Sequence, residues 1–402
     1  MKKLIEIIKK EKEKQEKSIN LIASENYVSQ EILNAQGSIL TNKYAEGYPG
    51  KRYYSGCKFI DKIERNTIKL AKKLFKADYA NVQPHSGSQA NQAVYMALCN
   101  KNDIILGMKL DHGGHLTHGS EINYSGKMYN FIKYGLNKYE YIDYNEIEYL
   151  SKKFKPKLIV AGTSSYSKII DWNILKKISE KVNAYLLVDI SHIAGLIISN
   201  LYPSPINVAD VVTSTTQKTI RGPRGGIILA KKNKEIEKKI NSAVFPGIQG
   251  GPFIHTIAAK LIAFEEALSK KFKKYQKQTI INTKYFSEIL KNKNFEIISG
   301  ETDTHLFLVN LKNKKKTGEE VEKKLEKANI LVNKNSIPND YLPSKITSGI
   351  RIGTPAITTR GFKTEEIKII AKWIDEIITK NENPENIKQK VINLCKKFPT
   401  YK

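Results

Sequence analysis

Short apolar runs separated by helical patterns fill the central part of the chain. The runs are rich in Val, Ile and Leu without strict alternation, which is typical of strands buried on both faces of a sheet. They lie at 103–107, 157–162, 184–189, 209–215 and 225–230. Helical periodicity occurs between several of them, for example at 61–75 and 172–183. Strands that alternate with helices predict an α/β fold with a mostly parallel sheet.

The two ends of the chain follow other patterns. Residues 1–17 have the pattern of a charged amphipathic helix, and 18–60 have no clean periodicity but many Tyr, Gly and Ser residues, which predicts a long structured loop. A glycine-proline loop at 245–253 precedes a long amphipathic helix predicted over 254–290.

After residue 291 the pattern changes to short apolar runs, "FEIISG", "HLFLVNL", "ANILVN" and "GIRIGT", with helices between them. We therefore expect an N-terminal helical arm (1–17), a large α/β domain (18–270) and a smaller C-terminal α+β domain (271–402).

Composition narrows the class of protein. Hydrophobic residues make up 40% of the chain and charged residues 27%, and no apolar run approaches the roughly 20 residues that a membrane span needs. The N-terminus lacks the apolar core of a signal peptide. Cys57, Cys99 and Cys395 are scattered, without the spacing of a disulfide framework or a metal site. We expect a cytoplasmic protein with no membrane partner.

The formal net charge of +27 raises the question of a nucleic-acid partner. The excess comes from Lys spread along the whole length, together with abundant Asn and Ile, and this favours compositional bias over a basic binding face. We expect no specific nucleic-acid partner, although diffuse charge gives weak, salt-sensitive binding to polyanions.

Lys218 and Asp189 are the first candidates for chemistry. Each follows or ends a predicted strand, and ligands collect beyond the carboxyl ends of strands in open α/β sheets. A lysine held among Ser and Thr can form a Schiff base, and a buried acid can pair with a pyridinium nitrogen, which together are what pyridoxal phosphate requires. The alternatives are a surface lysine and an aspartate that caps the next turn.

Two glycine-containing motifs supply further candidates. Ser86, Gly87 and Ser88 precede a helical segment, where hydroxyls and free amides favour a phosphate, although an ordinary serine cap gives the same pattern. "HGGHLTHG" (112–119) spaces three histidines by three residues, but no Cys or carboxylate cluster completes a metal site. We expect no metal, and a planar imidazole of this loop stacked on an aromatic cofactor is the other interpretation.

Arg351 and Glu46 complete the set that the residues themselves suggest. Arg351 lies near the end of a strand, where its guanidinium can bind a carboxylate through two hydrogen bonds, or form a structural salt bridge. Glu46 lies among tyrosines, and desolvation there raises the pKa of a carboxyl and suits it to proton transfer. An exposed loop with aromatic anchors is the alternative.

Nine stretches, in order from about residue 20 to 365, resemble the serine hydroxymethyltransferase family. They are "LIASEN", "NKYAEGYPGKRYYSGC", "NVQPHSGSQAN", "HGGHLTHG", "VDISHIAGL", "TTQKTIRGPRGG", "VFPGIQGGP", "LVNKNSIPND" and "SGIRIGTPAITTRGF". The resemblance implies a fold-type I pyridoxal-phosphate transferase with a large, mostly parallel seven-stranded sheet domain and a smaller α+β C-terminal domain. It also implies a dimer or a dimer of dimers that interconverts serine plus tetrahydrofolate with glycine plus methylenetetrahydrofolate.

The resemblance also implies roles for individual residues. Lys218 would carry the cofactor as a Schiff base, Asp189 would hold the ring nitrogen protonated, and His115 would stack on the ring. The other implied cofactor contacts are Ser86, Gly87, Ser88, Ser164 and His192, with Tyr44, Gly250 and Gly251 from the neighbouring subunit.

For the substrate, the resemblance implies that Arg351 and Ser24 bind the carboxylate. Glu46 and Tyr54 of the neighbouring subunit would handle the hydroxyl and the proton, with Arg224 close to Tyr54. The implied folate contacts are Tyr53, Leu110, Gly114, Leu116 and Asn335.

Gln217 departs from the family pattern, which has His immediately before the lysine. Glutamine forms hydrogen bonds but cannot carry a proton near pH 7. We expect retained activity with altered reaction specificity, so Gln217 belongs to the candidate catalytic set. Two rivals remain: another enzyme of the same fold, such as a threonine aldolase or an aminotransferase, and a basic RNA-binding protein on a decayed enzyme scaffold.

Overall fold

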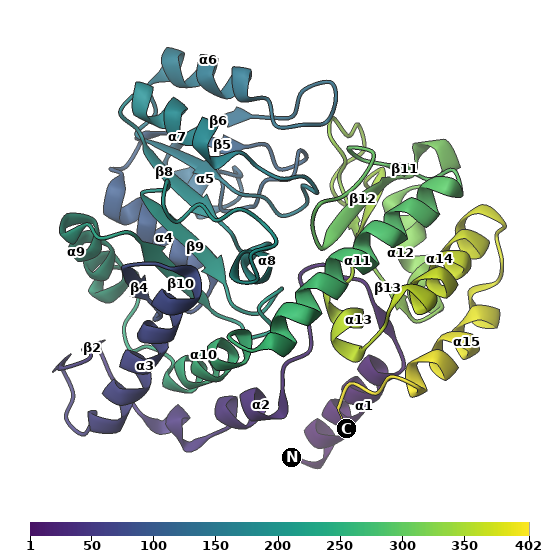
Figure 1. Cartoon of the computed structure of the whole chain (residues 1–402), viewed down its shortest axis with the longest axis horizontal. Helices are drawn as coiled ribbons and strands as arrows, with labels where there is room; N and C mark the ends of the chain where they lie inside the picture. The colour runs from purple at the N-terminus through teal and green to yellow at the C-terminus, as the bar shows by residue number, and fades with distance from the viewer. Residues whose placement is uncertain (402) are drawn as a thin grey trace. The chain divides into compact units, whose positions relative to one another are not determined.

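The computed structural model describes residues 1–401, apart from the side chain of residue 2. The chain forms two compact units (Figure 1). The large unit comprises Val28–Ser164 and Ile169–Lys273, and the small unit comprises Met1–Tyr27, Ser165–Lys168 and Lys274–Lys402. This division differs from the expected 1–17, 18–270 and 271–402 in two places, because 1–27 and 165–168 group with the C-terminal part.

Hydrogen bonds explain why these short segments belong to the small unit. β1 (Ile19–Asn20) pairs in parallel with β13 (Ile330–Leu331), which adds the chain just after the N-terminal helix to a C-terminal strand. The backbone N–H of Asp303 donates to the carbonyl of Ser167 at 2.8 Å. Pairing over such distances in the sequence is not visible in local periodicity.

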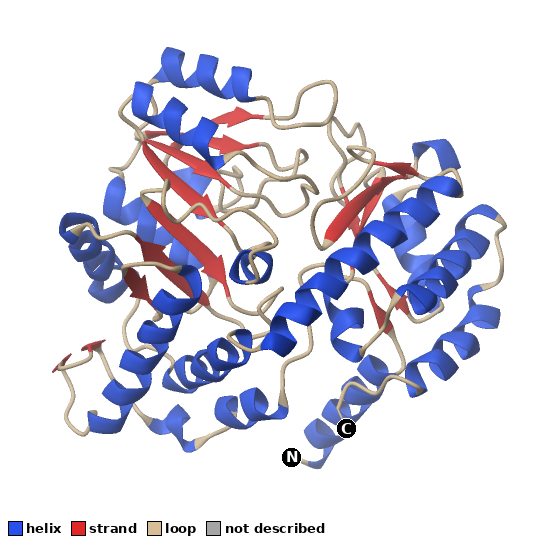
Figure 2. Cartoon of the chain, viewed as in Figure 1, coloured by secondary structure: helices blue, strands red, loops and turns tan. Residues whose placement is uncertain are grey.

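The large unit is built on a seven-stranded sheet with helices packed around it (Figure 2). Its strand order is β4-β10-β9-β8-β7-β5-β6. The neighbours from β9 to β6 are parallel, whereas β10 is antiparallel to both β9 and β4. The strands are β4 (Tyr79–Asn81), β5 (Ile104–Met108), β6 (Asn130–Tyr134), β7 (Leu158–Ala161), β8 (Tyr185–Asp189), β9 (Val211–Thr215) and β10 (Gly226–Ala230). The α/β prediction with a mostly parallel seven-stranded sheet is confirmed.

The remaining elements of the large unit surround this sheet or lie in its loops. They are α2 (Gln30–Gln36), η1 (Ile39–Asn42), β2 (Gly47–Tyr48), β3 (Lys51–Arg52), α3 (Lys58–Phe75), α4 (Gly87–Leu98), α5 (Tyr124–Met128), α6 (Tyr144–Phe154), α7 (Trp172–Lys181), α8 (Ala194–Ile198), α9 (Lys234–Ser242), η2 (Ala243–Ile248) and α10 (Ile254–Ala267). α4 packs on β9 and β10, and α7 packs on β7 and β8. The expected loop at 18–60 therefore contains several elements too short to show periodicity.

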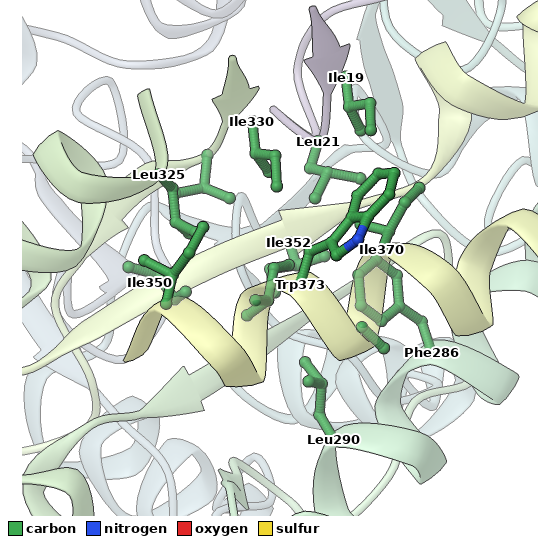
Figure 3. Packing of buried hydrophobic residues seen from close by; sticks show 14 of the residues in the cluster. Ile19, Leu21, Phe286, Leu290, Leu325, Ile330, Ile350, Ile352, Ile370 and Trp373 are labelled. Atoms are coloured by element: carbon green, nitrogen blue, oxygen red, sulfur yellow. The ribbon is translucent and has the colours of Figure 1, made fainter. Parts of the chain in front are cut away.

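The small unit has a four-stranded sheet, ordered β11-β12-β15-β14. Its elements are α1 (Lys2–Glu16), β1, most of α11 (Lys270–Asn292), β11 (Glu296–Ile297), β12 (Leu306–Asn310), η3 (Lys312–Lys314), α12 (Gly318–Lys327), β13, β14 (Asn333–Asn335), β15 (Gly349–Gly353), α13 (Pro355–Arg360), α14 (Thr364–Thr379) and α15 (Pro384–Lys396). Figure 3 shows its core, in which Trp373 of α14 lies among Ile19, Leu21 and Phe286. The predicted α+β pattern after residue 291 is confirmed.

One predicted helix is two. In place of a single helix over 254–290, α10 ends at Ala267 and α11 (Lys270–Asn292) begins three residues later. The Ser269 hydroxyl accepts from the N–H of Phe272 at 3.1 Å and donates to the carbonyl of Glu266 at 2.7 Å. The Ser269 side chain thus bonds the end of one helix and the start of the next. The apolar period of the sequence continues through this turn, so it does not reveal that the helix is interrupted.

Across residues 1–401, no helix combines the length and the apolar character that crossing a membrane requires.

Candidate active site

The carboxyl edge of the large sheet brings together residues that are far apart in sequence. Lys218 follows β9, Asp189 ends β8, and Ser164 follows β7. Because β4 is antiparallel to β10, and β10 is antiparallel to β9, the segment after β4 reaches the same edge and leads to Ser86. The loop after β5 carries His115 to this edge as well, since the N–H of Ser164 donates to the carbonyl of Gly113 at 2.7 Å.

Asp189 is a buried anion of this edge, and both of its carboxylate oxygens have hydrogen-bonding partners. Its Oδ1 accepts from the N–H of Ser191 at 3.0 Å and from its hydroxyl at 2.6 Å. Its Oδ2 accepts from Asn91 Nδ2 at 2.9 Å and lies 3.3 Å from His118 Nε2. Burial would raise the pKa of this carboxyl, but the hydrogen bond and the charge of His118, the charge of His115 and the bond from Ser191 together hold it below its usual value. The site therefore keeps Asp189 ionised.

The partners of Asp189 were missed in the sequence. Asn91 lies on α4, one turn after its start, and its Oδ1 accepts from the Thr213 hydroxyl at 2.6 Å. His118 belongs to the histidine motif that was weighed as a metal site. Among residues 1–401, no group of three or more potential ligands forms such a site. The spacing of the histidines instead places His118 against the carboxylate and leaves His115 to bond Thr117, at 2.8 Å between Nδ1 and Oγ1.

Lys218 and Gln217 sit half-buried beyond the end of β9. Lys218 Nζ donates to Thr215 Oγ1 at 3.1 Å. Gln217 Oε1 is buried and, within the described part of the chain, accepts no hydrogen bond. A buried acceptor without a donor costs free energy, so a bound ligand with an N–H or O–H group would satisfy it.

The segment at 84–88, which we call the cradle, fits a phosphate. Ser86 caps α4, a helix of 12 residues, and its hydroxyl accepts from the N–H of Gln89 at 3.2 Å. A Cβ atom at Gly87 would lie 2.6 Å from Thr215 Cγ2, so only glycine lets the cradle approach β9 this closely. Hydroxyls, free amides at a helix start and a nearby lysine are the donor set for a phosphate with a carbonyl group.

The donors of the cradle, the lysine and the ionised aspartate at one sheet edge therefore fit pyridoxal phosphate. Ser88 is exposed, Ser164 is half-buried, and His192 is buried in the turn after Asp189, with its carbonyl bonded by Thr219 Oγ1 at 3.1 Å. Leu110, Gly114 and Leu116, the predicted folate contacts of the large unit, lie in the same loop as His115.

A second group in the large unit, the aromatic cluster, contains Tyr44, Glu46, Tyr54, Gly250 and Gly251. Tyr44 donates to Glu46 Oε1 at 3.3 Å, and its ring meets that of Tyr54 edge-on, with centroids 5.0 Å apart. A Cβ at Gly250 would lie 3.0 Å from Glu46 Oε1. Tyr44 and Tyr54 are 52% and 46% exposed, so both are open to contact with another molecule.

Two other predicted residues of the large unit are Tyr53, which adjoins Tyr54 in the sequence, and Arg224. The ring of Tyr53 is 77% exposed and lies 5.6 Å from that of Phe245, and Arg224 is exposed in the turn before β10. Their predicted roles, in folate binding and beside the Tyr54 ring, stay predictions.

The small unit holds the predicted carboxylate-binding residues. Arg351 is buried in β15, its Nε donates to Asn333 Oδ1 at 3.1 Å, and burial lowers its pKa to about 10, so it stays charged at neutral pH. Ser24 follows Ala23, whose Cα would lie 2.5 Å from a Cβ added at Gly353. That contact places Ser24 beside the end of the strand that carries Arg351. Asn335 ends β14, the neighbour of β15.

Known proteins match the chain along nearly its whole length. A family model described as serine hydroxymethyltransferase matches residues 1–374. The serine hydroxymethyltransferase of Wigglesworthia glossinidia brevipalpis is 59% identical over 404 residues, which cover 100% of this chain and 96% of that protein. Those of Legionella pneumophila (strain Lens) and Buchnera aphidicola subsp. Acyrthosiphon pisum (strain 5A) are 56% and 58% identical, over 99% and 98% of this chain and 96% and 95% of theirs. On these matches, the chain belongs to the serine hydroxymethyltransferase family.

Proposed function

We propose that this protein transfers the hydroxymethyl carbon of serine reversibly to tetrahydrofolate, giving glycine and 5,10-methylenetetrahydrofolate, with pyridoxal phosphate held on Lys218. The observation that carries the proposal is the convergence of Lys218, the ionised Asp189 and the cradle at one sheet edge, in a chain of this family. The bound cofactor supplies an electron sink for carbanion chemistry at the substrate Cα.

The chain's own residues bind and orient around that group. Asp189, fixed by four hydrogen-bonding contacts, keeps a proton on the ring nitrogen because a buried anion favours the protonated partner. The cradle would bind the phosphate, and His115, oriented by Thr117, would stack on the ring. Ser164 and His192 would contact the ring oxygen.

The substrate is bound by its carboxylate. Arg351, oriented by Asn333, forms the two-pronged contact with this group, and Ser24 assists. Glu46 and Tyr54 hold or move the proton at the substrate hydroxyl. Tetrahydrofolate binds along Tyr53, Leu110, Gly114, Leu116 and Asn335, and these loops distinguish the reaction from that of a threonine aldolase or an aminotransferase.

The first experiment is absorbance spectroscopy of the purified protein. Pyridoxal phosphate joined to a lysine gives an absorbance band at roughly 420 nm, and Lys218→Ala should abolish it. Lys239→Ala is the matched control, because Lys239 is exposed and pairs with Glu235 on its own helix. A band that persists in Lys218→Ala would refute the assignment of the anchor. A second assay measures glycine formation from serine with and without tetrahydrofolate. Glycine formation that requires tetrahydrofolate distinguishes this activity from those of other enzymes of the fold.

The protein should act as a homodimer, or a pair of dimers, with shared active sites. The aromatic cluster supports this proposal, because its two tyrosines are about half exposed. Lys218→Ala and Glu46→Gln should each be inactive alone. If Glu46 serves the neighbouring subunit, a random mixture of the two variants regains about one quarter of the wild-type activity, since half of the dimers are mixed and each has one intact site. No recovery in mixtures that exchange subunits would contradict shared sites.

We also propose that the protein works in the cytoplasm. The three cysteines are buried and free, which suits a reducing compartment. Fractionation of cells that express a tagged chain tests the location.

A further inference from the structure

Lys260, in the middle of α10, is a buried cation that the proposed reaction does not use. Its side chain is 1% exposed, among the largest fully buried side chains of the protein. Within residues 1–401, no carboxylate lies at ion-pair distance from it. Its Nζ instead donates to three backbone carbonyls, those of Val82 at 2.7 Å, Pro84 at 3.1 Å and Gly226 at 2.8 Å. A lysine buried this completely is rare unless its ammonium group is fully bonded.

The three carbonyls belong to the two segments that shape the cradle. Val82 and Pro84 lie on the path from β4 to Ser86, and Gly226 begins β10. The N–H of Gly226 donates to the carbonyl of Pro84 at 3.0 Å. A Cβ at Gly226 would lie 2.3 Å from the carbonyl oxygen of Ser86, so β10 and the cradle touch along their backbones. Lys260 therefore ties these two segments together immediately behind the cap of α4.

The bonding pattern suits a charged side chain. An ammonium group has three N–H donors and no acceptor, and here three carbonyls meet those three donors. Burial lowers the pKa of Lys260 to about 7, against the opposing attraction of Glu64. A neutral amine would turn a lone pair toward one carbonyl oxygen, so the geometry favours the cation. A cation behind the cradle attracts a phosphate in front of it, since the interior screens charges weakly.

We propose that Lys260 is a positioning residue for the cofactor phosphate: it fixes the backbone of the cradle and places a positive charge behind it. The inference rests on the proposed cofactor site. Lys260 itself does not touch the cofactor, because its three donors are taken by the protein. Replacing Lys260 should therefore weaken binding of the phosphate group without changing the bond between the cofactor carbonyl and Lys218.

The test compares two ligands that differ only in the phosphate. Apo-protein is titrated with pyridoxal 5'-phosphate and with pyridoxal, and the dissociation constants are read from the absorbance band of the lysine adduct. Lys260→Met keeps an unbranched apolar stem, one atom shorter, without the charge. The preference for the phosphorylated ligand should fall by about tenfold, the loss of one charge-assisted interaction, with the affinity for pyridoxal nearly unchanged. Lys239→Met, an exposed lysine on α9, is the control and should keep the full preference.

The outcomes separate this inference from the proposed function. If wild-type protein does not bind pyridoxal phosphate, the proposed function fails. If wild-type binds it and Lys260→Met retains the full preference, or loses affinity for both ligands equally, Lys260 is not a positioning residue for the phosphate. Should Lys260→Met fail to fold, Lys260→Gln, which keeps two N–H donors without the charge, carries the same comparison with the same two results.

Discussion

Replacing Asp189 by asparagine tests the hydrogen-bond pattern at the centre of the site. The carboxylate accepts at Oδ1 from Ser191, twice, and at Oδ2 from Asn91, with His118 beside it. An asparagine offers one oxygen and one NH₂ group. In one orientation its NH₂ meets the NH₂ of Asn91, whose own oxygen is taken by Thr213, and in the other it meets the backbone N–H of Ser191.

Either orientation leaves one buried N–H without an acceptor, which costs about 1–3 kcal/mol, and turns the remaining charge-assisted bonds into weaker neutral ones. The large unit of cofactor-free Asp189→Asn should therefore be less stable by about 2–4 kcal/mol. The variant should also bind pyridoxal phosphate in a poorly active form, since a neutral amide does not hold the ring nitrogen protonated.

The assay uses the position of the two tryptophans, of which Trp172 lies in the large unit and Trp373 in the small one. In a Trp373→Phe background, fluorescence during urea unfolding reports on the large unit alone. Trp172 is a suitable probe because it is buried and bonded to the Pro203 carbonyl at 2.9 Å. The unfolding midpoint of Asp189→Asn should fall with the slope unchanged.

Two results would refute this reasoning. The first is an unchanged midpoint in Asp189→Asn. The second concerns the double variant Asn91→Asp with Asp189→Asn, which again places a carboxylate opposite an amide. This double variant should be more stable than Asp189→Asn alone, and no gain in stability would refute the reasoning.

The pH dependence of stability is a further check. The folded-state pKa of Asp189 is lowered, so its stabilisation is complete above about pH 4, the ordinary aspartate value, and disappears as the pH falls through the lowered one. The difference in unfolding free energy between wild type and Asp189→Asn should therefore narrow only below about pH 4.

Three further predictions concern other residues. Gln217→His, which adds a group that carries a proton near pH 7, should lower the rate of abortive transamination relative to hydroxymethyl transfer, and an unchanged ratio would contradict a role for this position. Arg360 donates to the carbonyls of four residues near the two ends of the chain, at 2.8–3.1 Å. Arg360→Met removes these donors and should destabilise the small unit by about 3–5 kcal/mol, measured by urea unfolding in a variant whose only tryptophan is Trp373. Arg360→Lys, which keeps a charged donor, should destabilise it less. Gly87→Ala places a Cβ 2.6 Å from Thr215 Cγ2 and should weaken binding of pyridoxal phosphate about tenfold, and adding Thr215→Ser, which removes that methyl group, should restore it.

The local sequence was enough for elements whose burial is regular. The runs ending at Asp189 and Thr215 are strands, as their unbroken apolar character predicted, because strands buried on both faces have no polar side to interrupt them. β4 and β6 were missed: β4 is only three residues long, and three of the five residues of β6 are only partly buried. The break between α10 and α11 was missed because the apolar period continues while Ser269 bonds both ends.

By itself, the sequence determined the class of fold and the family, and it predicted the residues that anchor the cofactor, since these depend on residue types and on motifs within short segments. Only the tertiary structure decided which other groups bond the predicted site residues. Asn91 and His118 became partners of Asp189, and Lys260 came to bond the carbonyls of the segment that leads to Ser86, through the packing of segments more than 60 residues apart. Backbone carbonyls and buried amides carry no sequence signal, because every residue has them, and only packing shows which are brought together.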